Sequence, residues 1–258
     1  MINTGNSFLG GQGWYDNALW VDPIDANHVI VGGIDLWRST DGGTNLNKIS
    51  TWWQAPNSAH ADHHFVMEHP DYDGINNKRV FFANDGGMYE TPDITVAQDS
   101  VGWQELNNNL TITQFYGIGV SPDGTVVGGT QDNGTLVYKN DSENWTATFG
   151  GDGGFSAADP TDSNYLYGEY VYLQIHRSTN GGSSSSYIFD SRMETDGANF
   201  IAPFILDPNN ENRLLGGAER LWQTTNAKDA SPAWSTIKDA SPSNSPISAI
   251  AVASGNSD

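Results

Sequence analysis

The stretch that decides the fold is residues 18–50, ALWVDPIDANHVIVGGIDLWRSTDGGTNLNKIS. Its short apolar runs are separated by turn-forming Asp-Pro, Gly-Gly and Asp-Gly-Gly sequences. This pattern is typical of strands joined by tight turns, because each run is too short for a helix of ordinary length. We expect four strands here, at Leu19 to Asp22, Val29 to Gly33, Asp35 to Ser39 and Asn47 to Ser50.

The first half of this stretch recurs along the chain. The later copies read VMEHPDYDGINNKRVFFAN, IGVSPDGTVVGG, AADPTDSNYLYGE and ILDPNNENRLLGG. The aligned prolines are Pro23, Pro70, Pro122, Pro160 and Pro208, and Ser254 falls in register in a sixth copy. The mean interval is about 46 residues, which matches a four-stranded propeller blade.

The sequence therefore predicts an all-β protein, a β-propeller built from four-stranded antiparallel blades. We expect one propeller domain over residues 1–258, with five full repeats over about 15–246 and the first strand of a sixth blade at 247–252. Incomplete ends would leave strand edges unpaired, so the termini must pair, several chains must associate, or missing blades must complete a larger ring. We favour the larger ring.

Composition excludes several kinds of partner. The formal charge is −20, with 11 basic and 31 acidic residues, so binding to nucleic acid is not expected. No apolar run reaches the length of a membrane helix, and residues 1–14 lack the features of a signal peptide. The absence of cysteine excludes disulfides and zinc-thiolate sites.

Two turns between the expected third and fourth strands share one motif. The first reads Ser39-Thr40-Asp41-Gly42-Gly43-Thr44-Asn45-Leu46 and the second Ser178-Thr179-Asn180-Gly181-Gly182-Ser183-Ser184. Both resemble the Asp-box, or bacterial neuraminidase repeat, Ser-x-Asp-x-Gly-x-Thr-Trp. An Asp or Asn side chain can accept N–H groups within the turn, and glycine tolerates positive φ. The structural positions of the motif are Ser39, Asp41, Gly43, Ser178, Asn180 and Gly182.

The copies depart from the motif. Asn45 and Leu46 replace its Thr and Trp, and Asn180 replaces its Asp. The resemblance implies a superfamily that includes sialidases, xyloglucanase-type glycoside hydrolases and sortilin-like receptors. It implies fold more strongly than function. Sialidase chemistry is not expected, because only Arg192 and Arg220 of the six arginines fall near the expected ligand face.

An acidic residue follows the second strand of every repeat. These residues are Asp35, Asp85, Asp132, Glu169 and Glu219. We expect them to face the mouth of the propeller channel, where their charge favours cations or neutral sugars. Carboxylates are hard ligands, so calcium is the ion that such a site favours, although no EF-hand-like spacing is present. Alternatively, these acids serve as ordinary turn residues.

Residues 60–64, His-Ala-Asp-His-His, concentrate three of the six histidines. His60, Asp62 and His63 are candidate ligands for a metal or a glycan, together with Asp85. The spacing matches no zinc motif, and strand alternation would point His63 and His64 in opposite directions. Packing against neighbouring loops is the alternative interpretation.

Asp132 and Asp152 lie in Gly-rich loops 20 residues apart and are the candidate catalytic pair of a glycosidase. Such enzymes need two carboxyl groups about 5 Å apart for retention, or roughly 6.5 to 9.5 Å for inversion. Gln131 and Tyr116 are candidate ligand residues beside them, and Trp52 and Trp53 are rings that could stack on sugars.

We therefore expect an extracellular or periplasmic propeller with a carbohydrate-associated role, either glycan binding or glycoside hydrolysis. The alternative is a non-catalytic adhesion or scaffold propeller that binds protein or peptide ligands, as sortilin-like proteins do.

Overall fold

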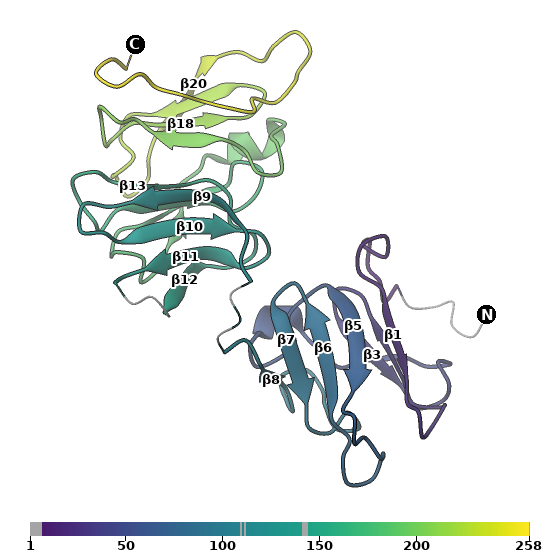
Figure 1. Cartoon of the computed structure of the whole chain (residues 1–258). Helices are drawn as coiled ribbons and strands as arrows, with labels where there is room; N and C mark the ends of the chain where they lie inside the picture. The colour runs from purple at the N-terminus through teal and green to yellow at the C-terminus, as the bar shows by residue number, and fades with distance from the viewer. Residues whose placement is uncertain (1–6, 109, 111, 141–143, 258) are drawn as a thin grey trace. The chain divides into compact units, whose positions relative to one another are not determined.

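The computed structural model of the chain describes residues 7–108, 110, 112–140 and 144–257. Over these residues the strands form five four-stranded antiparallel sheets, and the helical segments are the short 3-10 turns η1 (Trp52–Gln54) and η2 (Ser191–Thr195). Figure 1 shows the sheets as groups of neighbouring arrows. The predicted all-β fold with four-stranded blades is confirmed. No helix in the described residues is long and apolar enough to cross a membrane.

Each blade uses four strands that follow one another in the chain. The first contains β1 (Ala18–Val21), β2 (Val29–Gly32), β3 (Leu36–Ser39) and β4 (Asn47–Lys48). The second contains β5 (His63–Glu68), β6 (Val80–Asn84), β7 (Gly87–Thr91) and β8 (Gln104–Glu105). The third contains β9 (Phe115–Val120), β10 (Val126–Thr130), β11 (Gly134–Tyr138) and β12 (Trp145–Phe149). The fourth contains β13 (Ser156–Ala158), β14 (Leu166–Glu169), β15 (Ile175–Ser178) and β16 (Ser186–Tyr187). The fifth contains β17 (Phe204–Leu206), β18 (Leu214–Gly217), β19 (Leu221–Thr224) and β20 (Trp234–Lys238).

The chain divides into two compact units. Unit 1, Met1–Ile112, holds the first two blades, and unit 2, Thr113–Asp258, holds the other three. The core of unit 1 includes the fully buried side chains of Ile30 and Phe82. The largest core of unit 2 joins its fourth and fifth blades and includes Tyr167 and Leu214. Each such side chain contributes about 1.5 to 3 kcal/mol by leaving water.

The recurring Asp-Pro turns have a local physical cause. The carboxylates of Asp22, Asp159 and Asp207 are buried and accept the N–H group two residues ahead, at 2.7 to 2.8 Å. Each carboxylate also bonds to a hydroxyl or cationic side chain, which is Tyr72 for Asp22, Lys228 for Asp159 and Arg213 for Asp207. Burial alone would raise the pKa of these carboxyls, but the hydrogen bonds outweigh it and hold each pKa below its ordinary value.

The two Asp-box-like turns share a hydrogen-bond pattern. The buried Ser39 hydroxyl accepts the Gly43 N–H at 2.8 Å and donates to Asp41, whose Oδ1 accepts the Asn45 N–H at 2.8 Å. Ser178 accepts the Gly182 N–H at 2.8 Å and donates to Asn180 in the same way. The Asn amide oxygen thus replaces the carboxylate.

The first two and the last two blades are joined in the same manner. Arg38 donates to the carbonyl oxygens of Ile94 and Ala97 in the next blade, and Arg177 donates to those of Ala227 and Asp229. These two arginines therefore serve to hold neighbouring blades together.

The expected sixth-blade strand and two aromatic positions depart from a regular blade repeat. Trp103, directly before β8, and Trp234, the first residue of β20, are buried, but Trp145 in β12 and Tyr187 in β16 are 38% and 47% exposed. The Trp145 ring lies beside those of Phe115 and Tyr138, at centroid distances of 5.3 and 5.4 Å. Residues 247–252 form no strand, although Ile247 N–H donates to the Ala218 carbonyl oxygen.

Candidate functional site

The histidine cluster of residues 60–64 does not converge. His63 begins β5 with its side chain fully buried, and its ring lies edge-on to Phe82 at a centroid distance of 6.3 Å. Neither ring nitrogen has a hydrogen-bond partner among the residues that the structure describes, and burial lowers the pKa of His63 to about 3. These features favour the packing interpretation for His63. His60 lies over Gly86, so a methyl group at that glycine would overlap its ring.

His64 and Asp85 form a polar pair on the same unit. His64 Nε2 lies 2.6 Å from Asp85 Oδ1, and the Tyr15 hydroxyl donates to the same carboxylate at 3.1 Å. Asp62 accepts a hydrogen bond from Gln12 Nε2 at 3.0 Å. Two of these partners, Gln12 and Tyr15, come from the segment before β1, for which the sequence predicts no function. The sequence feature that could have pointed to this segment is the run Gly-Gly-Gln-Gly-Trp-Tyr-Asp at residues 10–16.

Trp52 and Trp53 lie on η1, after the first blade. None of the η1 residues is buried, and the rings of Trp52 and Trp53 are 41% and 63% exposed. The two rings meet edge to face at 5.6 Å, and Lys48 Nζ lies 5.0 Å from the centre of the Trp53 ring. Trp53 borders a surface hollow that is also lined by Gln54, Ala55, Asn57 and Ser100.

The backbone around η1 is fixed from both ends. Asp35 Oδ1 accepts the Trp52 N–H at 2.9 Å, while its Oδ2 pairs with Lys48 Nζ at 2.6 Å. Ser58 Oγ accepts the Thr51 N–H at 2.8 Å, and the Thr51 hydroxyl donates to Asp99 at 3.0 Å. Asp35 is thus buried and stabilises the backbone of the Trp52–Trp53 loop. This structural role agrees with the alternative interpretation, in which the recurring acidic residues serve as turn residues.

Asp132 and Asp152 lie together in unit 2. Asp152 Oδ1 accepts the Asp132 N–H at 3.0 Å, and Asp132 has a φ of 60°. Burial raises the pKa of Tyr116, and the negative charges of Asp152 and Asp132 raise it further. The Gln131 N–H donates to the Gln114 carbonyl oxygen at 3.0 Å. The carboxylate of Asp152 therefore holds the turn that carries Asp132.

Glu169, the last residue of β14, has a different environment from Asp132, which follows β10. It is fully buried, and its Oε1 accepts the N–H groups of Leu173 and Ala202 at 3.0 and 2.8 Å. Its Oε2 accepts the Phe155 N–H at 3.3 Å. Burial raises the pKa of Glu169 to about 8, although these three donors favour the charged form. The buried Glu169 carboxylate thus connects the backbone of three segments of unit 2, at Phe155, Leu173 and Ala202.

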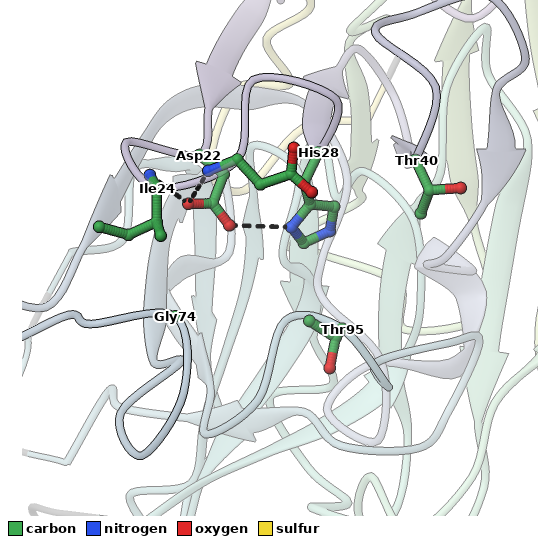
Figure 2. Close-up of a pocket in the computed structure, with 7 residues that line it drawn as sticks. Asp22, Ile24, His28, Thr40, Gly74 and Thr95 are labelled. Atoms are coloured by element: carbon green, nitrogen blue, oxygen red, sulfur yellow. Dashed lines mark hydrogen bonds and ion pairs between the residues drawn. The ribbon is translucent and has the colours of Figure 1, made fainter.

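A second hollow lies on the turn side of unit 1, where Figure 2 shows Asp22 facing His28. His28 Nδ1 lies 3.2 Å from Asp22 Oδ2, and the same oxygen accepts the Tyr72 hydroxyl at 2.6 Å. Asp22 and His28, two of the polar side chains that line this hollow, are therefore engaged in holding the Asp-Pro turn. We place the candidate ligand site at the Trp53 hollow instead.

Comparison with known proteins gives matches of structure only. No family model matches the chain, and no curated protein matches it. The GH74 xyloglucanase from Xanthomonas campestris is 16% identical, with a TM-score of 0.41 over 86% of this chain and 38% of the enzyme. YCF48 from Cyanidioschyzon merolae is 9% identical, with a TM-score of 0.37 over 87% of this chain and 86% of that protein. The extracellular domain of a one component system from Bacteroides thetaiotaomicron is 17% identical, with a TM-score of 0.38 over 92% and 33%. The chain thus spans less than two fifths of the length of the xyloglucanase.

Proposed function

We propose that this chain is an Asp-box propeller that binds a neutral carbohydrate through the Trp53 hollow. The observation that carries the proposal is the exposure of Trp52 and Trp53 on one 3-10 turn, beside the amide side chains of Gln54 and Asn57. Indole rings stack on the apolar faces of sugars, and amides and hydroxyls bond to the sugar hydroxyls. The hydrogen bonds of Ser39 and Ser178 support the Asp-box assignment.

The loop is organised before any ligand binds. Asp35 and Ser58 hold its backbone, so little conformational entropy is lost when a sugar stacks on Trp53. The overall charge of −20 disfavours anionic glycans. A polysaccharide ligand is consistent with a role outside the cytoplasm, and we propose that the protein acts there.

A glycan array tests this proposal. We expect wild type to bind neutral oligosaccharides, such as fragments of β-glucan or xyloglucan, and Trp53→Ala to bind at least about tenfold more weakly because it loses the stacking surface. Trp14→Ala is the matched control, since Trp14 is 82% exposed but lies outside the hollow. Binding that is lost in Trp14→Ala and kept in Trp53→Ala would contradict the proposal.

Two further measurements, of peptide binding and of reducing-sugar release, separate the other functions. Binding of peptides without any glycan would favour the adhesion or scaffold alternative. Release of reducing sugar by wild type, lost in both Asp132→Asn and Asp152→Asn, would assign hydrolysis, with the two carboxyls as its acid and base. The contact between Asp152 and the Asp132 backbone supports treating them as one group.

A further inference from the structure

The outermost strands of the five blades differ in how well their free edges are protected. Within each unit the first strands lie beside one another, β1 with β5 and β13 with β9 and β17, whereas each fourth strand is the edge of its sheet. Three of the fourth strands, β4, β8 and β16, have two residues each, and β20 carries Lys238. Short length and lysine are common means of preventing a sheet edge from pairing with another chain.

The fourth strand of the third blade, β12, has neither protection. It is five residues long, and no acidic or basic residue occurs in any of the four strands of its blade. Trp145, Thr146 and Ala147 are exposed, and β11 is the backbone partner of β12 among the described residues. Figure 1 shows β12 at the edge of its sheet. This edge is therefore open to another strand.

The sequence of β12 favours a second copy of the same strand. Its pairing with β11 is regular from Trp145 to Ala147, and Thr148 is the extra residue of a bulge. In an antiparallel pair centred on Thr146, this threonine faces Thr146 of the other copy, and Trp145 lies opposite Ala147. Thr–Thr pairs stabilise antiparallel sheets, and the small Ala147 leaves room for the indole ring. The same residues meet on both copies, as a two-fold axis requires.

Charge and local packing support the same partner. Each chain carries a formal charge of −20, so two copies are repelled wherever their carboxylates meet, and β12 contains none. The bulged end of the strand is fixed within unit 2. Thr148 Oγ1 lies 3.0 Å from Ser185 Oγ, and the Phe149 ring stacks on that of His176 at a centroid distance of 4.1 Å. The edge is thus uncharged and ordered before a second strand is added.

We propose that β12 pairs with β12 of a second copy of this chain, antiparallel about Thr146, and joins two four-stranded third blades into one continuous sheet. Contacts of such small area are weak and reversible, so the dimer should dissociate on dilution. High salt should strengthen the dimer, because salt screens the repulsion between two acidic chains and the contact contains no ion pair.

Sedimentation equilibrium of the full chain tests this pairing. We expect wild type to approach the mass of two chains at high protein concentration. Thr146→Lys should raise the Kd of the dimer at least about tenfold, because two ammonium groups would face each other. Thr236→Lys is the matched control, since Thr236 is exposed in β20, the other five-residue fourth strand. A single-chain mass for wild type at every concentration, or a dimer that Thr146→Lys does not weaken, would overturn the proposal.

Cysteine cross-linking tests the register without the lysine substitution. The chain has no cysteine, so Thr146→Cys introduces a single thiol. Directly opposite residues in an antiparallel pair have Cβ atoms about 4.5 to 5.5 Å apart, so copper phenanthroline should oxidise two Thr146→Cys chains to a disulfide-linked dimer. Thr236→Cys should remain largely a single chain under the same oxidation. Equal cross-linking of the two variants, or none of Thr146→Cys, would overturn pairing about Thr146.

Discussion

Replacing Gly129 with Ala is expected to destabilise unit 2 by about 3 kcal/mol or more, which is at the severe end of single substitutions. Gly129 lies in β10, where a β-carbon would come within 2.0 Å of the Gly154 carbonyl oxygen and 2.7 Å of the Gly153 carbonyl carbon. Both obstacles are backbone atoms, so no side-chain rotation relieves the overlap. The third blade and the 153–158 segment of the fourth would have to separate.

Gly150→Ala is the matched control for this substitution. Gly150 precedes the same loop, is exposed, and has no atom within 4 Å of an added β-carbon. Denaturant unfolding should therefore give nearly the same stability for Gly150→Ala as for wild type. Equal stability of the two variants would show that the close approach of the third and fourth blades is wrong.

Stability should also depend on pH through Glu169. Its pKa is about 8 in the folded state, compared with 4.5 for an ordinary glutamate. Between these values the folded state holds a proton that the unfolded state has released. The contribution of Glu169 is therefore present below about pH 4.5 and is lost as pH rises through 8, by on the order of 5 kcal/mol in total.

The window from pH 6.5 to 8 isolates this effect. The buried histidines His63 and His176 have pKa values lowered to about 3 from 6.5, so they reduce stability only as pH falls below 6.5. We expect the free energy of unfolding of wild type to fall by about 2 kcal/mol across the window.

Glu169→Gln should remove this dependence. Its amide oxygen can still accept the N–H groups of Leu173 and Ala202, but it does not titrate. Glu169→Ala should be strongly destabilised at every pH, because three backbone N–H groups lose their acceptor. If the free energy of unfolding of wild type did not change between pH 6.5 and 8, the raised pKa of Glu169 would be wrong.

The blades could be predicted from sequence because their signals are local. The Asp-Pro turn at Asp22 is made by a side chain that bonds to an N–H group two residues ahead. The turn at Ser39 involves five consecutive residues and closes on Gly43. Such contacts need no knowledge of distant parts of the chain, so the repeat, the strands and the turns were evident before the structure.

The roles of the acidic residues could not be predicted in this way. Asp35 and Glu169 occupy the same repeat position as Asp85, yet both are buried supports of loop backbone. Burial depends on which neighbouring loops cover each residue, and those loops differ from blade to blade.

The most direct test of carbohydrate binding at the Trp53 hollow is oxidative footprinting of tryptophan, read by mass spectrometry with and without a neutral oligosaccharide. The account predicts that a saturating oligosaccharide slows oxidation of Trp53 severalfold and leaves Trp14, the more exposed ring, unchanged. Equal oxidation of Trp53 in both samples, or protection of Trp14 instead, would contradict it.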